Sequence, residues 1–419
     1  MIDLSSEDAL RLHVLVQNAE AIRIDENRMV VYGLNGEREL KAPLNPNCRS
    51  DKYLMRVRET LAAAVLDSPG GYPVFLRRWT RMGQIDNEQM DRLLKLGEPE
   101  AVMAVVCSPG LTDELARRAW WVAPYSEYAR RMLNCQRVVN GTMGPILARH
   151  LVEHLPFETE QRDMLETVRL VLQPGLIDDE QRQRLWDAGR SKKSYRVGFL
   201  ATTPNALPEP QSARPEYAEL YPQLAPLIAT GNGAAKQLAQ ILSEPGQRFV
   251  ATATDALRRP ADQEVVAALL NAIGHYFADL RWQTQRIDSL TALWQAALAP
   301  LQRANISAAE LQAAGADPTA ITADPEQTSD DAPGPETQRI DDISTLWHAL
   351  PTQRPELLAL LLLAHIDEHL LTPIFARSDA IGTVMRRHIA PIIDPLQLQF
   401  AQLLGHKSPT HDVRRESEA

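Results

Sequence analysis

The chain has 419 residues, and 44 lysines and arginines against 54 aspartates and glutamates give a formal net charge of −10. Hydrophobic residues make up 44% and charged residues 23%, which is typical of a folded soluble chain and excludes wholesale disorder or a fibrous repeat. The acidic excess argues against wrapping nucleic acid by charge alone. We therefore expect no nucleic-acid partner.

The first 46 residues predict one helix followed by three short strands. Ser5 is suited to capping a helix, and an apolar periodic run follows it. Residues 21–24, 29–32 and 39–41 read as strands, and the pair Asn35-Gly36 favours a tight hairpin turn. Residues 1–46 are therefore predicted to form a helix and a three-strand meander.

From about residue 49 onward the apolar spacing is helical, interrupted by Pro-Gly pairs. The fold class is therefore predicted as mainly α, with irregular, repeat-like helical-hairpin packing and the small N-terminal β meander. Six prolines within 204–226 indicate a linker, and 315–337 carries six acidic residues with no lysine or arginine, which is typical of a disordered linker. The expected segments are 47–203 (helical domain), 204–226 (Pro-rich linker), 227–314 (helical domain), 315–337 (acidic disordered linker), 338–405 (C-terminal helical segment) and 406–419 (disordered tail).

A ten-residue phrase occurs twice, at 285–294 and at 338–347. Both copies begin Gln-Arg-Ile-Asp and end Leu-Trp, with apolar residues at helical spacing. We expect a duplicated packing helix on either side of the acidic segment.

The N-terminal residues, the longest apolar run and the cysteines indicate where in the cell the protein is expected. The first residues, Met1 to Asp8, are acidic and do not read as a signal peptide, and the longest apolar run is the eight residues 357–364. A membrane-spanning helix needs about 20 apolar residues, so no membrane span is expected. The three cysteines are widely spaced and odd in number, which favours a reducing cytoplasm over a disulfide framework.

Several segments of the first 200 residues carry a family resemblance. They are Asp8-Ala9-Leu10-Arg11-Leu12, Ala21-Ile22-Arg23-Ile24-Asp25, Ser68-Pro69-Gly70-Gly71-Tyr72-Pro73, Arg77-Arg78-Trp79-Thr80-Arg81-Met82-Gly83, Leu96-Gly97-Glu98-Pro99-Glu100-Ala101, Ala116-Arg117-Arg118-Ala119-Trp120-Trp121, 168–178 and Val197-Gly198-Phe199-Leu200. Their order resembles the DsrS family, soluble proteins encoded alongside the reverse-acting dissimilatory sulfite reductase of sulfur-oxidising bacteria. The resemblance covers roughly residues 5–200. It implies a cytoplasmic accessory or regulatory role in sulfur oxidation, with protein partners from that machinery, and it transfers no catalytic residue.

Two segments read H-x-x-E-H. On a helix the two histidines of such a motif share one face, where they could hold zinc or iron as a metal-binding protein or a metal-dependent hydrolase does. The alternative interpretation, which carries more weight, is ordinary helix surface, because short motifs recur by chance. The residues are His150, Glu153, His154 and His365, Glu368, His369.

Arginines and aromatic residues alternate in two places. Such mixtures serve as anchors in protein interfaces and as stacking surfaces for RNA, but tryptophans packed in a core beneath arginine stems have the same pattern. We carry these residues as candidates for partner binding: Arg77, Arg78, Trp79, Arg117, Arg118, Trp120, Trp121, Arg130 and Arg131.

Cys135 lies close in sequence to Arg130, Arg131 and Arg137, which could favour its thiolate. A persulfide-carrying thiol is therefore one hypothesis, and an inert cysteine in the core is the alternative. The chain contains no dinucleotide-binding glycine motif, phosphate loop or G-x-S-x-G nucleophile motif. The leading hypothesis is a non-enzymatic accessory protein that acts through protein contacts, without a bound cofactor.

Overall fold

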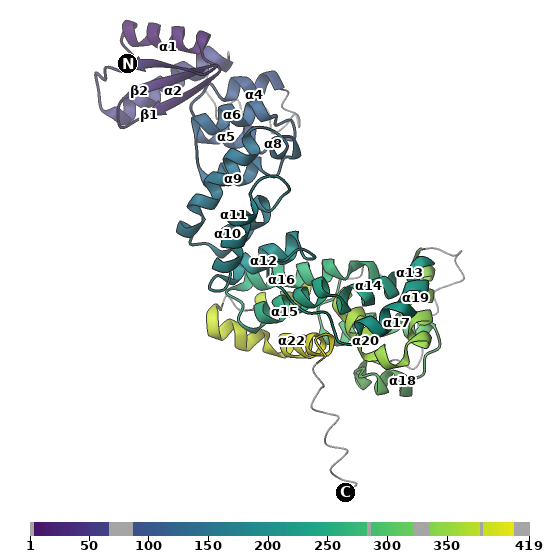
Figure 1. Ribbon diagram of the computed structural model, residues 1–419. Coiled ribbons are helices and arrows are strands. Elements are labelled where there is room, and N and C mark those ends of the chain that lie inside the picture. Colours follow the sequence, from purple (N-terminus) through teal and green to yellow (C-terminus); the bar gives the residue numbers. More distant parts are fainter. Residues whose placement is uncertain (1–3, 67–86, 283–285, 322–334, 378–379, 406–419) are drawn as a thin grey trace. The chain divides into compact units, whose positions relative to one another are not determined.

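A computed structural model describes residues 4–66, 87–282, 286–321, 335–377 and 380–405 (Figure 1). It is mainly helical with one small antiparallel sheet near the N-terminus, as predicted. The chain divides into two compact units. The N-terminal unit comprises Met1–Phe157 with Gln173–Asp178, and the C-terminal unit comprises Glu158–Leu172 with Asp179–Ala419.

The N-terminal unit carries the sheet and a set of short helices. Its elements are α1 (Ser6–Asn18), β1 (Ala21–Asp25), β2 (Val30–Asn35), β3 (Arg38–Pro43), α2 (Ser50–Leu66), α4 (Asn87–Leu93), α5 (Pro99–Val106), α6 (Asp113–Val122), α7 (Ser126–Met132), α8 (Gln136–Val139), α9 (Met143–His154) and the 3-10 turn η1 (Leu155–Phe157). As predicted, the Ser5 hydroxyl caps α1, accepting the Asp8 backbone N–H at 3.1 Å.

The sheet has the strand order β1-β2-β3, with both pairs antiparallel. Asn35 pairs with Arg38, so the turn residues are Gly36 and Glu37, one position later than the predicted pair Asn35-Gly36. Gly36 has φ +57°, and a two-residue hairpin with its only positive φ at the first turn position favours glycine there. The hairpin prediction is confirmed and its turn is shifted by one residue.

The two faces of the sheet have different neighbours. α1 covers one face so closely that a Cβ atom on Gly33 would lie 3.1 Å from the Leu15 Cγ. The other face carries Arg23, Tyr32 and Lys41, which are cross-strand neighbours in the register. The polar face is therefore left for the site described below.

Asp8 joins α1 to α2 through buried hydrogen bonds. Its carboxylate accepts the Asn45 backbone N–H at 3.0 Å and the Tyr53 hydroxyl. Burial alone would raise the pKa of Asp8, but the hydrogen bonds from Tyr53, Asn45 and Ser5 bring that pKa below its usual value. Burial and the neighbouring carboxylate raise the pKa of Tyr53.

The C-terminal unit is entirely helical in its described residues. Its elements are α10 (Gln161–Val171), α11 (Asp179–Ala188), α12 (Lys193–Thr202), α13 (Tyr217–Ala229), α14 (Gly233–Leu242), α15 (Glu244–Arg258), α16 (Gln263–Tyr276), η2 (Ala278–Leu280), α17 (Leu290–Arg303), α18 (Ala308–Ala313), η3 (Pro318–Ala320), α19 (Pro335–Ala349), η4 (Pro351–Gln353), α20 (Arg354–Ala364), η5 (Glu368–Leu371), α21 (Thr372–Phe375) and α22 (Gly382–Leu403).

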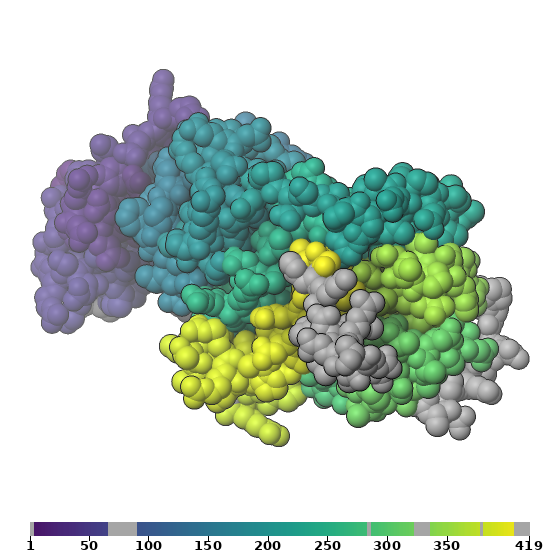
Figure 2. All heavy atoms as spheres, turned by 60° about the horizontal axis from the view of Figure 1, so that its bottom comes forward, coloured from purple at the N-terminus to yellow at the C-terminus, as the bar shows by residue number. Residues whose placement is uncertain are grey.

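The core of this unit is built around α20. Every residue from Glu356 to Ala364 is buried, and α20 contacts α16, α17 and α22. α22 lies at the surface of the unit, where Figure 2 shows it in yellow. No single helix in the described ranges is long and apolar enough to cross a membrane. One pair of helical segments, Pro351–Ala364 and Glu368–Phe375, reaches that length and composition only across a 79° bend.

The predicted linker at 204–226 is wrong from residue 217 onward. α13 begins at Tyr217, and it buries Leu220 and Leu224 while packing on α14. The division between units also lies elsewhere, because α12 buries Ser194 to Leu200 and contacts α15 and α16 of the second unit. The apolar area that α13 buries stabilises a helix in this segment despite its prolines.

The predicted disordered linker at 315–337 is wrong at both of its ends, which form regular structure. η3 occupies Pro318–Ala320 with Ala320 buried, and α19 begins at Pro335. The interval 322–334 and the predicted tail at 406–419 lie outside the described residues.

The duplicated phrase does not form the same structure twice. In the first copy the helix begins only at Leu290, because the Ser289 hydroxyl caps it by accepting the Ala292 N–H at 3.3 Å. The second copy lies wholly inside α19, and its Asp342 accepts the Gly233 N–H at 2.9 Å near the start of α14. The expectation of a duplicated helix is therefore wrong for the first half of the first copy. The Leu-Trp pair is nevertheless buried in both copies.

Candidate functional site: a mixed-charge cleft in the N-terminal unit

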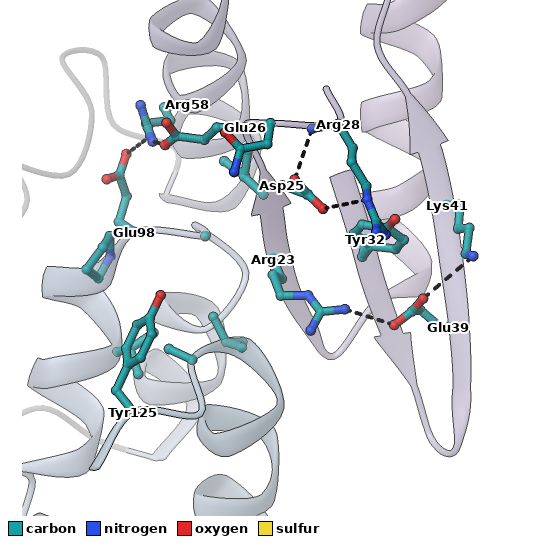
Figure 3. A pocket seen from close by; sticks show the side chains of 17 residues that line it. Arg23, Asp25, Glu26, Arg28, Tyr32, Glu39, Lys41, Arg58, Glu98 and Tyr125 are labelled. Atoms are coloured by element: carbon teal, nitrogen blue, oxygen red, sulfur yellow. Dashed lines mark hydrogen bonds and ion pairs between the residues drawn. The ribbon is translucent and has the colours of Figure 1, made fainter. Parts of the chain in front are cut away.

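A cleft of about 820 Å³ opens over the polar face of the sheet (Figure 3). Its walls come from β1, β2 and β3, from α2, from the turn that precedes α5 and from the turn that follows α6. Four cations and four carboxylates line it: Arg23, Arg28, Lys41 and Arg58 with Asp25, Glu26, Glu39 and Glu98.

The sheet register places one half of these charges. Arg23, Tyr32 and Lys41 lie side by side on the three strands, with the Arg23 guanidinium 5.2 Å and the Lys41 ammonium 5.5 Å from the Tyr32 ring centre. The Arg23 guanidinium also lies 4.8 Å from the Trp121 ring centre. Glu39 binds Arg23 at 3.1 Å and lies 3.9 Å from the Lys41 Nζ. The result is a ladder of alternating cations and aromatic rings.

The other half of the cleft is assembled from distant parts of the chain. Arg58 on α2 pairs with Glu26 after β1, and its Nε lies 3.3 Å from the Glu98 carboxylate before α5. Burial raises the pKa of Glu98, and the Arg58 guanidinium opposes that rise. Asp25 accepts the Arg28 backbone N–H at 3.0 Å and lies 3.8 Å from its Nε.

Gly97 brings the turn before α5 onto β1. Its φ is +65°, and a Cβ atom there would lie 3.0 Å from the Ile24 Cγ1. A side chain at this position would therefore be strained in its backbone and crowded against β1. The glycine lets Glu98 approach the strand closely enough to line the cleft.

The side chains that line the cleft can form ion pairs and aromatic contacts with a bound molecule. Among the described residues that line it, none is Cys, His, Ser or Thr. Its four carboxylates each have a cation within ion-pair distance. Tyr125 stands at the rim with 62% of its surface exposed, and tyrosine with arginine is typical of binding surfaces.

No protein-family model, curated protein or solved structure matches this chain. Its function must therefore be inferred from the chemistry of its own residues.

The arginine-aromatic segment on α6 is largely engaged within the unit. Arg117 pairs with Glu114 at 2.7 Å and donates to the Gly36 carbonyl at 3.2 Å, and Arg118 pairs with Asp91 at 2.8 Å. Their charge is thus used to hold α6 against the hairpin and α4. Both arginines therefore already have carboxylate partners in the same unit, and their role in partner binding stays a prediction.

The other members of that predicted set are dispersed. Trp121 contributes to the cleft through its contact with Arg23, whereas Trp120 packs edge-on against His150 at 4.7 Å between ring centres. Arg130 is buried at 7% exposure and Arg131 is exposed. Arg77, Arg78 and Trp79 lie outside the described residues.

The first H-x-x-E-H motif lies on α9, as predicted. The His150 and His154 rings stack 3.9 Å apart, the His150 Nε2 is 3.3 Å from the Ser126 hydroxyl, and Glu153 is exposed. Burial and the neighbouring His154 lower the pKa of His150. Among the described residues, no three His, Cys, Asp or Glu side chains lie together as a metal would need.

The second motif is not on one helix. α20 ends at Ala364, and Asp367 caps η5 by accepting the His369 N–H at 2.9 Å. His365 is buried with its Nδ1 2.8 Å from the Leu361 carbonyl, while Glu368 bonds to Asn271 at 3.1 Å. The expected helical face of His365, Glu368 and His369 is therefore wrong, since a helix end and a new cap separate the two histidines.

Cys135 immediately precedes α8 and is half-buried. Its Sγ lies 3.5 Å from the Leu111 carbonyl, and the nearby Arg137 guanidinium donates to the Pro109 carbonyl at 3.2 Å. The sulfur-carrier hypothesis stays a prediction.

Sequence reasoning missed the cleft residues, although half of them had a usable signal. Once the hairpin is accepted, Tyr32 pairs with Lys41, and alternation along β3 puts Glu39 on the same face. A charged face on a small sheet was therefore readable. The contribution of Arg58 and Glu98 was not, because their positions depend on how α2 and α5 pack.

Proposed function

We propose that this protein is a non-enzymatic accessory protein that acts through protein contacts, and that the mixed-charge cleft is where its partner binds. From the resemblance of residues 5–200 to the DsrS family, we further propose that this role is cytoplasmic and belongs to sulfur oxidation by the dissimilatory sulfite reductase system. The observation that carries the proposal is the cleft itself, which has equal numbers of cations and carboxylates and an aromatic ring between two of the cations.

The charge balance selects the kind of ligand. A phosphate or another small anion would meet as many carboxylates as cations, so the cleft offers it no net field. A polypeptide segment carrying both signs of charge can instead exchange ion pairs with the walls. Partly exposed ion pairs contribute only about 0–1 kcal/mol each, so exchanging them costs little.

The aromatic residues supply the remaining contact. Tyr125 is exposed at the rim, and the Tyr32 ring lies between the Arg23 and Lys41 cations. Such rings provide large, rigid contact area with little loss of conformational freedom on binding. The expected partner is a protein with a charged, partly apolar segment.

Affinity purification from a sulfur-oxidising cell extract tests this proposal. The bait proteins are the wild type, a cleft variant with Arg58→Glu and Tyr125→Ala, and a control with Arg184→Glu on the exposed face of α11. Mass spectrometry identifies the bound proteins, and calorimetry with the purified partner measures affinity. The proposal expects a sulfur-oxidation component bound by wild type and control, and at least about tenfold weaker binding by the cleft variant.

Two results would contradict the proposal. One is the absence of any sulfur-oxidation component from the wild-type eluate. The other is a partner that binds the cleft variant as tightly as the wild type, which would move the interface elsewhere on the molecule.

A further inference from the structure

We propose that the open edge of β3 pairs antiparallel with β3 of a second copy of this chain, forming a two-fold homodimer with one continuous sheet. This inference concerns self-association and goes beyond the partner binding proposed above. It rests on three observations: an edge of β3 that no other strand of the described residues pairs with, a charge pattern that is complementary to itself, and an exposed apolar strip beside that edge.

β3 is the outer strand of the sheet on the side away from β1 (Figure 3). In the hairpin, the closing pair Asn35–Arg38 exchanges hydrogen bonds, so alternation makes Gly33–Leu40 the next hydrogen-bonded pair. Glu39 lies between these two pairs and Lys41 follows the second of them, so both belong to pairs without hydrogen bonds to β2 and their backbone N–H and C=O groups point to the outer side. Such groups are a template for another strand.

Charge selects one register for the pairing. Around a two-fold axis at Leu40, Glu39 lies opposite the partner's Lys41, and Lys41 lies opposite the partner's Glu39. Both of these pairs would be hydrogen-bonded, because these are the residues whose backbone groups face outward. An axis at residue 39 or at residue 41 would instead oppose two carboxylates or two ammonium groups, which is unfavourable across a strand pair.

The opposite face of the same edge is apolar. A groove of about 470 Å³ runs between α1 and β3, and Leu40 lines it with Leu10 and Val14 of α1. Leu10 is 64% exposed and Val14 54% exposed, and their spacing of four residues puts both on one helix face. In the proposed register Leu40 meets the partner's Leu40, so both apolar strips are brought to the axis and removed from water.

Pro43 limits the interface to a short one. Proline donates no backbone N–H, and the Pro43 carbonyl already accepts from Arg11 at 3.3 Å, so the ladder ends there. A two-fold pairing also uses the same edge on both copies, which closes the assembly at two. The expected product is a reversible dimer without growth into fibres.

Sedimentation of the purified full chain tests the proposal through charge reversal. Glu39→Lys alone and Lys41→Glu alone each place like charges opposite one another, and each is expected to weaken self-association about tenfold or more. An equimolar mixture of the two variants restores opposite charges between chains, so it is expected to form a heterodimer. Circular dichroism confirms that each variant is folded.

A cross-linking measurement keeps the test decisive if a charge variant fails to fold. In the proposed register only residue 40 faces itself, at the Cα separation of about 4.5 Å typical of a pair without hydrogen bonds, which a disulfide can bridge. Leu40→Cys is expected to form a covalent dimer under mild oxidation, and Glu39→Cys much less. Wild type reports the background from the three natural cysteines.

The inference is overturned if the wild type stays monomeric up to about 100 μM. It is equally overturned if both charge variants dimerise like the wild type, or if Leu40→Cys and Glu39→Cys cross-link alike. These measurements use the purified chain alone, so failure here leaves the cleft proposal standing, and loss of partner binding leaves the dimer standing.

Discussion

Two clusters of opposite charge, one in each unit, differ in burial. In the cleft of the N-terminal unit, the Arg58 side chain is 31% exposed and its partner Glu26 is 54% exposed. In the C-terminal unit, Arg214 is 9% exposed and Glu356 is 5% exposed, with 3.5 Å between the guanidinium and the carboxylate. The two clusters have similar chemistry and different access to water.

The buried cluster holds three elements of its unit together. Arg214 donates to the carbonyls of Gln402 and Leu403, at 2.9 and 3.1 Å, at the end of α22. It also pairs with Glu216 just before α13, and Gln402 donates to Glu356 at 3.0 Å. This is why the segment ahead of α13 is ordered despite its prolines.

The comparison teaches that burial, more than charge pairing, separates structural from binding residues. A buried charge has no water to replace a lost partner, so its pairing is obligatory. An exposed charge can return to water or accept a different partner at small cost. The predictions below test this contrast, beginning with the largest expected effect.

Arg214→Ala is expected to lower the free energy of unfolding of the C-terminal unit by about 3–5 kcal/mol, because it leaves Glu356 buried without its cation. Denaturant unfolding followed by hydrogen exchange in α22 measures the loss. Arg184→Ala, at a largely exposed pair on α11, is the matched control and should change little. An equal effect of both substitutions would break the contrast between buried and exposed charges.

His365 extends the contrast to a buried group without a counter-charge. Burial lowers its pKa to about 4, and the nearby Arg281 guanidinium also opposes protonation. The folded protein therefore prefers neutral imidazole. This stabilisation is fully present above the unfolded pKa of about 6.5 and is lost as pH falls towards about 4, by on the order of 3 kcal/mol.

His365→Leu removes this titration. Denaturant unfolding between pH 7 and pH 4 should show a smaller acid-induced loss for the variant than for the wild type, and NMR can follow the imidazole directly. Parallel pH profiles for the two proteins would mean that protonation of His365 costs no stability. That result would contradict the expectation from its burial, since only 3% of its surface is exposed.

Arg58→Ala should have the smallest effect on stability, about 1 kcal/mol or less in the N-terminal unit, because Arg58 and Glu26 are partly exposed. The remaining cost comes from Glu98. Burial already raises the pKa of this carboxyl, and the substitution removes the Arg58 cation that opposes that rise. Thermal unfolding of this variant beside Arg58→Gln, which keeps much of the side-chain stem, measures it. A loss as large as that expected for Arg214→Ala would make the cleft a structural cluster.

Much of the local structure was predictable because short-range rules govern it. The cap at Ser5, the strands of the meander and the hairpin turn near Gly36 follow from the residue itself and its close neighbours. The H-x-x-E-H spacing at 150–154 did lie on a helix, and the spacing at 365–369 did not. A five-residue motif cannot show that a helix ends in its middle.

The linker prediction failed for a related reason. Proline content is a local signal, whereas the order of 204–226 depends on Arg214 reaching α22, nearly two hundred residues later, and on Leu220 and Leu224 finding α14. The ion pairs of Arg117 and Arg118 also depend on contacts with distant parts of the chain. The sequence displays their charge but does not show that tertiary packing brings Glu20 to Arg117 and Asp91 to Arg118.

By itself, then, the sequence determined the helical class, the small meander and the face of that sheet on which Tyr32 and Lys41 lie. Helix periodicity, caps and strand alternation act over a few residues and need no knowledge of the fold. Tertiary structure alone decided which charges are neutralised, which stay accessible and that Arg58 meets Glu98 in one cleft. Those outcomes depend on burial and distance, which are set only when segments far apart in the chain pack together.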